Sequence, residues 1–250
     1  MSRNRIDPSA RLIGDVQLGA DNVIEAGAII IGPIQIGDGN YFGPYCVIGA
    51  PPEDDFLSAE IREGGLQSAS GFVSIGDRNV LREFVTVHRG LTAVTEIGDD
   101  CYVMSHSHVA HDCSLRDRVK VATSVTIAGY CWIGRGAYLG LSSSIRQFGV
   151  IGGHAMIGMG SVVTRPTGIA SLVHGNPARA VRPNGPALER LGVAETGWWA
   201  ALQDGQQDAA VPDELAADLA EFSEAVDCSA RLQGEVAAWR AARRSASGGQ

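Results

Sequence analysis

The residues best suited to chemistry are gathered in one short segment. The run His106-Ser-His108-Val-Ala-His111-Asp112-Cys113 holds three histidines, and His111 directly precedes an aspartate. An imidazole beside a carboxylate titrates near neutrality and can serve as a general base. Histidine clusters can also hold a metal ion, and a single histidine is often only a packed core residue. Spacing alone therefore leaves the chemistry open until the surrounding pattern places these side chains in space.

The sequence around this run carries an apolar residue at every sixth position. One series continues without a gap from Ile97 to Ile169, and an earlier series runs from Ile6 to Ile48. This period fits neither an α-helix nor an ordinary strand. It is typical of a parallel β-helix built from hexapeptide repeats. The 32 glycines suit a chain that turns a corner every few residues.

Two stretches interrupt the six-residue series. Residues 51–72 carry no such pattern, so we expect them to form a loop inserted into the coil. The stretch from Arg89 to Glu96 holds a smaller excess of four residues. Because insertions in a solenoid usually gather on its working face, both stretches are candidates for the edge of a site.

The sequence pattern in the last quarter of the chain predicts helices. One helix is expected to open after Pro212, and a final helix is expected from Ser229 to about Arg243. The sequence therefore predicts a β-helix over residues 1–185 and a helical domain over residues 186–250.

The repeat also predicts which residues meet. With three hexads to a turn, residues eighteen apart stack at the strand spacing of about 4.8 Å. His111 then lies directly beneath Gly129, and His88 lies one coil below His111 once the four extra residues are allowed for. His108 ends near the same corner. The bare N–H of Gly129 could stabilise an oxyanion while His111 takes a proton, an arrangement that suits acyl transfer to a hydroxyl or an amine.

Composition narrows the class of protein. The net charge of −8 argues against nucleic acid or an anionic membrane as a bulk partner. The longest apolar runs fall short of a membrane span, and no signal-peptide core follows the first residues, so we expect a cytoplasmic protein without stable membrane insertion. Four of the five cysteines occupy a repeat position that is otherwise filled by small residues, which indicates small, buried, reduced side chains.

Several motifs together resemble one family of enzymes. Val85-Thr-Val-His88-Arg89-Gly90, His108-Val-Ala-His111-Asp112-Cys113, Ala128-Gly129, Arg146-Gln147-Phe148, Gly175-Asn176 and Leu188-Glu-Arg190-Leu-Gly192 occur in this order. They resemble the UDP-N-acetylglucosamine O-acyltransferases that begin lipid A synthesis. The resemblance covers nearly the whole chain, and its His-x-x-His-Asp core is much more specific than the hexapeptide repeat.

The resemblance implies a left-handed β-helix, a homotrimer and active sites between neighbouring subunits. It implies an acyl carrier protein thioester as donor, a UDP-sugar as acceptor, and no metal or other cofactor. By position, His111 matches the general base, Asp112 follows it, and Gly129 matches the oxyanion donor. The residues that match substrate contacts are His88, His108, Gln147, Asn184 and Arg190.

The chain departs from the family mainly on the acceptor side. Tyr130 and Arg146 stand where the family has histidines, and the substrate-loop segment Asp54-Asp55-Phe56-Leu57 lacks the family's lysine. The chemistry is therefore expected to be kept, while the acceptor stays open. Met159 matches a position that is glycine in long-chain members, so a bulky side chain there predicts a short or medium acyl group.

Two other functions compete with this interpretation. A metal enzyme like the γ-class carbonic anhydrases would use His106 and His111, which are five residues apart as in that family. A non-catalytic trimeric scaffold is the second, since repeat surfaces also bind partners. The sequence leaves open the acceptor, O- or N-acylation, the acyl length, and whether coenzyme A replaces the carrier protein.

Overall fold

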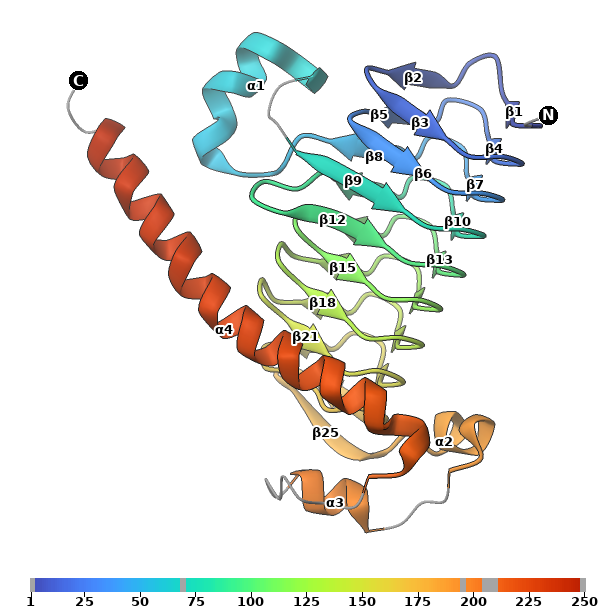
Figure 1. Ribbon diagram of the computed structural model, residues 1–250, viewed down its shortest axis with the longest axis vertical. Helices are drawn as coiled ribbons and strands as arrows, with labels where there is room; N and C mark the ends of the chain where they lie inside the picture. Colours follow the sequence, from blue (N-terminus) through green and yellow to red (C-terminus); the bar gives the residue numbers. More distant parts are fainter. Residues whose placement is uncertain (1–2, 68–70, 194–196, 204–210, 248–250) are drawn as a thin grey trace.

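The chain winds into a three-sided coil of parallel strands with a helical part at its C-terminal end (Figure 1). It is described here from a computed structural model, which covers residues 3–67, 71–193, 197–203 and 211–247. The predicted β-helix of hexapeptide repeats is confirmed.

Each side of the coil is one sheet, in which hydrogen-bonded neighbours come from successive turns, except that the last two strands of sheet A pair antiparallel. Sheet A contains β1 (Arg5–Ile6), β4 (Val23–Ile24), β7 (Tyr41–Phe42), β10 (Val80–Leu81), β13 (Tyr102–Val103), β16 (Lys120–Val121), β19 (Tyr138–Leu139), β22 (Met156–Ile157), β24 (Ser171–Gly175) and β25 (Ala178–Pro183). Sheet B contains β2 (Arg11–Ile13), β5 (Ile29–Ile31), β8 (Val47–Ala50), β11 (Thr86–His88), β14 (His108–Val109), β17 (Thr126–Ile127), β20 (Ser144–Ile145) and β23 (Val162–Val163). Sheet C contains β3 (Val16–Leu18), β6 (Ile34–Ile36), β9 (Phe72–Ile75), β12 (Val94–Ile97), β15 (Ser114–Leu115), β18 (Trp132–Ile133) and β21 (Val150–Ile151).

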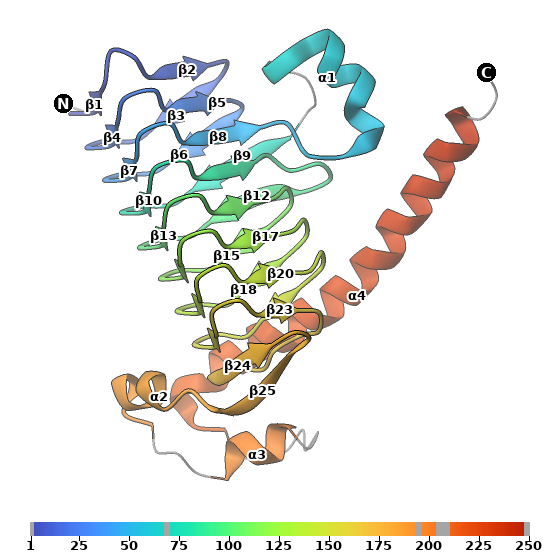
Figure 2. The same cartoon turned by 180° about the vertical axis from the view of Figure 1, so that it is seen from behind.

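The coil is left-handed. In Figure 1 the strands of sheet C face the viewer and run from left to right, and sheet A lies at the right-hand edge. The chain then returns along sheet B, which faces the viewer in Figure 2. Because the turns descend from the N-terminus in these views, the path is a left-handed screw, as the family resemblance implies and against the usual right-handed crossover preference.

The strand register sets the length of each turn. Val109 pairs with Ile127, and Ile127 pairs with Ile145, so residues eighteen apart stack as predicted. Val87 pairs with Val109 across a longer turn, because that turn includes the four extra residues found in the sequence. This register decides which side chains meet at each corner of the coil.

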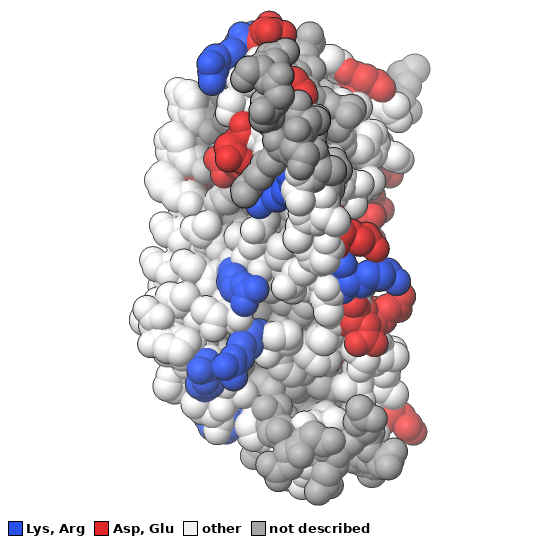
Figure 3. Space-filling view, turned by 90° about the vertical axis from the view of Figure 1, so that its left-hand side faces the viewer, with Lys and Arg blue, Asp and Glu red and all other residues white. Residues whose placement is uncertain are grey.

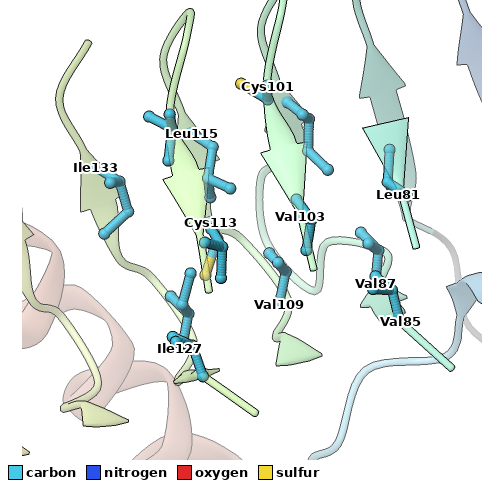
Figure 4. Close-up of a cluster of buried hydrophobic side chains, with 14 of the residues drawn as sticks. Leu81, Val85, Val87, Cys101, Val103, Val109, Cys113, Leu115, Ile127 and Ile133 are labelled. Carbon is cyan, nitrogen blue, oxygen red and sulfur yellow. The ribbon is translucent and has the colours of Figure 1, made fainter. Parts of the chain in front are cut away.

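The hexad residues form the core. From β4 to β23 the repeat residue of each short strand is buried, whereas Ile6 and Leu12 of the first turn are exposed. Figure 4 shows a part of this column with Leu81, Val103 and Leu115 pointing into the coil. Cys46, Cys101, Cys113 and Cys131 are free and buried, which confirms the prediction of small buried thiols. Burial raises the pKa of Cys46 and Cys101 to about 12, so these thiols stay protonated.

The inserted stretch leaves the coil after β8, as predicted, but it is partly helical. It contains two short 3-10 helices, η1 (Asp55–Leu57) and η2 (Gly65–Gln67), on either side of α1 (Ser58–Gly64). The Asp54 side chain caps η1 by accepting a hydrogen bond from the Phe56 N–H. We call residues 51–67 the inserted loop.

The C-terminal part covers the open end of the coil. It consists of α2 (Gly185–Leu191), α3 (Trp198–Gln203) and α4 (Asp213–Ser247). A second apolar cluster joins it to the last turn, through Ile169, Ala170, Leu188, Val193, Trp198 and Leu215. That it forms a domain of its own stays a prediction. In the described part of the chain, no helix combines the length and apolar character that crossing a bilayer needs.

The prediction of two separate helices after Pro212 is wrong, because α4 is continuous from Asp213 to Ser247. No glycine or proline interrupts residues 213–233. The Ser229 hydroxyl does not cap a new helix but donates a hydrogen bond to the Phe148 carbonyl (2.9 Å). The helix passes over β21 and then rises beside the coil towards α1 (Figures 1 and 2).

A buried ladder of asparagines supports the N-terminal turns. Asn40 accepts a hydrogen bond from the Asn79 N–H (2.9 Å), and its own N–H and side-chain amide donate to Asn22 (2.8 and 3.0 Å). All three side chains are buried. Because a buried N–H without an acceptor is costly, this ladder should contribute to the stability of the N-terminal turns.

Replacing Asn40 by alanine should lower the free energy of unfolding by about 1–3 kcal/mol, since it leaves the Asn79 N–H without its acceptor. Urea unfolding of both proteins at one concentration measures the difference. Gln35→Ala, a change at an exposed position of β6, is the control and should have little effect. Equal losses in the two variants would contradict a special role for the ladder.

Candidate active site

The predicted catalytic residues lie at the corner where sheet B turns into sheet C. This B–C corner comprises residues 110–113, 128–131 and 146–149 in three successive turns. A Cβ atom on Gly129 would lie 2.7 Å from His111 Cε1 and 2.8 Å from His111 Nε2. The imidazole therefore rests against the bare backbone of the next turn, and only glycine leaves room for it there. The predicted stacking of these two residues is confirmed.

Asp112 orients the imidazole of His111. His111 Nδ1 lies 2.6 Å from Asp112 Oδ2, and both side chains are at most 5% exposed. An ionised carboxylate only accepts hydrogen bonds, so Nδ1 carries the proton and Nε2 is left as the basic nitrogen. This is the tautomer that a general base requires.

The four extra residues found in the sequence hold Asp112 in its ionised form. Asp112 accepts hydrogen bonds from the N–H groups of Leu91, Thr92 and Ala93 and from the Thr92 hydroxyl. Burial opposes the charge, but the bonds from His111 and from these N–H groups outweigh it and hold the pKa of Asp112 below its usual value. The sequence reveals the excess length but not this role, because it gives no direction to a backbone amide.

The Gly129 N–H is free to bind a ligand. The neighbouring Ala128 N–H donates to the Ile145 carbonyl (3.1 Å), and the Tyr130 N–H donates to the His111 carbonyl (3.0 Å). Among the described residues, no acceptor is hydrogen bonded to the Gly129 N–H. The donor thus lies on the residue that packs against the imidazole, which is the placement an oxyanion donor needs.

His88 and His108 lie beside this pair, as predicted. Their rings pack edge to face with centroids 5.0 Å apart. His108 Nδ1 lies 2.8 Å from the Thr86 hydroxyl, and its Nε2 lies 3.5 Å from a carboxylate oxygen of Glu53 in the inserted loop. Burial, assisted by the charge of His108, lowers the pKa of His88 to about 4, so this imidazole is neutral near pH 7.

An aromatic pair forms one wall of the site. The Tyr130 ring packs edge to face on His111 with centroids 5.0 Å apart, and it stacks on Phe148 at 4.8 Å. Burial raises the pKa of the Tyr130 hydroxyl above its ordinary value. Arg146 and Gln147 lie one turn further along the same corner, where they line a small hollow against α4.

Three predicted substrate contacts lie elsewhere in a single chain. Met159 is 75% exposed at the corner between sheets A and B. Asn184 and Arg190 line a separate pocket that they share with His154 and Tyr138. These residues can reach His111 only if they come from a neighbouring subunit, so their roles stay predictions.

The inserted loop borders the site, which agrees with its predicted place on the working face. A largely apolar pocket between this loop and the coil is lined by His88 together with Ala50, Pro51, Pro52, Ile61 and Leu66. His106, in contrast, lies at the A–B corner, with its ring 4.8 Å from that of Phe84. It is therefore not part of the His111 cluster within one chain.

Comparisons of sequence show which proteins the chain is similar to. A family model described as bacterial transferase hexapeptide (six repeats) matches residues 15–50. Over 205 residues the chain is 34% identical to the acyl-[acyl-carrier-protein]–UDP-N-acetylglucosamine O-acyltransferase of Herminiimonas arsenicoxydans, covering 76% of this chain and 74% of that protein. It is 39% identical over 172 residues to the enzyme of the same name from Stenotrophomonas maltophilia strain R551-3, where the match covers 63% of this chain but only 62% of the relative.

Comparisons of structure give the same result. The crystal structure of the UDP-N-acetylglucosamine O-acyltransferase of Moraxella catarrhalis is similar with a TM-score of 0.66 and 25% identity, over 92% of both chains. The UDP-N-acetylglucosamine acyltransferase of Arabidopsis is similar with a TM-score of 0.72 and 27% identity, over 90% of this chain and 76% of that one.

The lowered pKa of His88 predicts a pH-dependent stability. Between its ordinary pKa of 6.5 and the folded value of about 4, the unfolded chain binds a proton that the folded chain does not. Stability is therefore lost as the pH falls through this range, by roughly 2 kcal/mol at pH 5. In His88→Gln the decrease in unfolding free energy from pH 7 to pH 5, measured by denaturant titration, should be smaller by that amount.

His174→Gln is the matched control, because His174 is exposed. Its pH dependence should equal that of the unchanged protein. If His88→Gln also kept the full dependence, the folded-state pKa of His88 would not be lowered.

Proposed function

Since this chain belongs to the UDP-N-acetylglucosamine O-acyltransferase family, we propose that it transfers an acyl group from an acyl carrier protein thioester to a hydroxyl of a nucleotide-sugar acceptor. That it is an acyltransferase follows from the family. The proposal is carried by the contact between His111, which an ionised Asp112 orients, and the bare amide of Gly129.

The geometry supports a direct transfer between the two substrates. His111 Nε2 takes the proton of the acceptor hydroxyl while the oxygen of that hydroxyl attacks the thioester carbonyl. The carbonyl becomes a tetrahedral oxyanion, which accepts a hydrogen bond from the Gly129 N–H. When the carbon–sulfur bond breaks, the thiolate takes the proton back from His111. Asp112 stabilises the imidazolium between these two steps.

The residues around the base decide which acceptor fits. The relatives are named for transfer from acyl carrier protein to UDP-N-acetylglucosamine. Here Tyr130 and Phe148 place an aromatic wall next to His111, where the family carries a histidine at position 130. We therefore propose a nucleotide sugar as the class of acceptor and leave the identity of its sugar open. An acceptor amine in place of the hydroxyl, and coenzyme A in place of the carrier protein as donor, are the alternatives. The buried free thiols are consistent with the proposed cytoplasmic location.

An exposed apolar strip supports a homotrimer. Four large apolar residues of the A–B corner are strongly exposed: Tyr45 (58%), Phe84 (49%), Leu141 (47%) and Met159 (75%). The rings of Tyr45 and Phe84 stack at 5.7 Å. Sheet B beside this strip carries few charges, as the left part of Figure 3 indicates. Because large exposed apolar side chains of this kind gather at interfaces, we infer that neighbouring subunits cover this corner and bring Met159 to the site.

His111→Ala should lower kcat for acyl transfer by about 10²- to 10⁴-fold, because it removes the general base. Gly129→Ala should lower kcat as well, since its Cβ atom would displace the imidazole from its place. Mass spectrometry of products from a panel of nucleotide sugars, acyl carrier proteins and coenzyme A thioesters measures both. Gly197→Ala, where an added Cβ meets nothing within 4 Å, is the control. Unchanged activity of His111→Ala would remove it as the base.

Met159→Glu should weaken self-association, because it places a charge on the apolar strip. Sedimentation velocity over a range of protein concentrations should then give a smaller species than the unchanged protein. Gln35→Glu adds the same charge on sheet C and should leave the assembly intact. A trimer that persists unchanged in Met159→Glu would place the interface on another surface.

A further inference from the structure

The polar positions of the B–C corner continue beyond the catalytic pair. The register of β17, β20 and β23 keeps residues eighteen apart in step over these turns. The second residue after the strand is His111 in one turn, Gly129 in the next, and then Gln147 and Arg165. Each turn rises by the strand spacing of about 4.8 Å. Arg165 therefore lies two turns beyond the oxyanion donor, roughly 10 Å along the coil.

Arg165 shares a hollow with Arg146, the residue that precedes Gln147. The hollow lies between this corner and α4 and has a volume of about 130 Å³. A pocket that encloses a whole small ligand has roughly 300–1,000 Å³. This hollow thus has room for one compact group, and the two arginines determine which kind of group it attracts.

Both arginines have their charge available for a ligand. Each is exposed, and Arg146 donates a hydrogen bond only to the uncharged Thr164 carbonyl, at 3.2 Å. Within the described part of the chain, neither guanidinium forms an ion pair, and no Asp or Glu lines the hollow. Figure 3 looks onto this side of the molecule, and the basic groups in its lower left part have no acidic group next to them. Two like charges at one hollow repel each other, so a bound anion would stabilise them.

Helix α4 forms the outer side of the hollow without neutralising it. The Ser229 hydroxyl donates to the Phe148 carbonyl (2.9 Å), and Gln233 Nε2 lies 3.5 Å from the Ser229 oxygen. The other residues of α4 at the hollow are Val226 and Ala230. The helix therefore narrows the space beside the arginines and brings an uncharged amide to it.

We propose that this hollow binds a phosphate ester group of a substrate, with Arg146 and Arg165 as its cations. A guanidinium is always charged and presents a planar set of donors that matches phosphate oxygens. Both substrates of the proposed reaction carry such a group. The acceptor has the diphosphate of a nucleotide sugar, and the donor has the phosphodiester of its pantetheine arm.

The place of the charge supports this assignment. The inserted loop brings the carboxylate of Glu53 to within 3.5 Å of His108, and its segment Asp54-Asp55-Phe56-Leu57 holds no lysine. On the B–C corner, in contrast, Arg146 stands where the family has a histidine. The corner thus offers the permanent positive charge that a phosphate needs. The proposal rests on the proposed function in taking the phosphate from one of its two substrates.

Calorimetric titration of the full-length protein with two probes tests the site. The probes are UDP and 4′-phosphopantetheine, measured at one low ionic strength because salt screens exposed charges. Arg146→Gln and Arg165→Gln should each raise the Kd of a probe by about tenfold or more, since each removes a charge-assisted hydrogen bond. Arg146→Lys keeps the charge but not the planar set of donors and should lose less affinity.

The two probes distinguish the source of the phosphate. A loss of affinity for UDP alone assigns the hollow to the acceptor, and a loss for phosphopantetheine alone assigns it to the donor. A loss for both shows that the two phosphates compete for one site. Uridine and pantetheine, which lack the phosphates, should bind the variants and the unchanged protein alike.

Arg11→Gln is the matched control. Arg11 is an exposed arginine of β2, on the same sheet but at the other end of the coil, and it forms no ion pair among the described residues. Its replacement should leave both Kd values unchanged. The site is overturned if either Arg146 or Arg165 can be replaced with no greater effect than Arg11. It is also overturned if neither probe binds the unchanged protein.

These titrations separate the phosphate site from the proposed function. If the arginine variants lose affinity for a probe while the unchanged protein transfers no acyl group to any acceptor, the site stands and the proposed function fails. If acyl transfer is normal and the Kd values do not respond, the function stands and the phosphate site fails.

Discussion

The vertical register of the coil is the constraint on which the candidate site depends. Each turn pairs with the next through short parallel strands, so that Val109 lies on Ile127 and Ile127 on Ile145. The buried aliphatic row fixes this pairing, because a slip of one residue would turn the apolar side chains outwards. Two residues beyond Val109 and Ile127, the same register brings the imidazole of His111 against Gly129. The site is therefore a direct product of the core packing.

The chemistry needs one addition to the bare coil. The turn between Val87 and Val109 is four residues longer than the next turn. Its loop aims three backbone N–H groups at the buried carboxylate of Asp112. A buried charge is stable only when it is paired and hydrogen bonded, so this loop is what allows an ionised aspartate beside His111. A coil of uniform hexads would offer the histidine and the glycine but not the group that orients the base.

Features that follow the six-residue period can be predicted well from the sequence, whereas single contacts between separate elements cannot. The six-residue spacing gave the coil, the stacking of His111 and Gly129 and the neighbourhood of His88, because each follows from counting along a repeat. Nothing in the sequence indicates that α4 is one helix, because Ser229 is a suitable first residue for a helix. Only the fold shows that the Ser229 hydroxyl instead donates to the Phe148 carbonyl. Nor could it pair Arg240 with Asp54, because no period relates two residues on separate elements. Contacts of that kind arise only from the assembled fold.

The most direct measurement is a crystal structure with a nucleotide sugar and a non-hydrolysable acyl-pantetheine analogue bound together. The account predicts that the acceptor hydroxyl lies within hydrogen-bond distance of His111 Nε2 and that the analogue's carbonyl oxygen accepts a hydrogen bond from the Gly129 N–H. It also predicts that His111 Nδ1 remains bonded to Asp112. Binding of both ligands at another corner of the coil, with His111 still enclosed, would contradict the account.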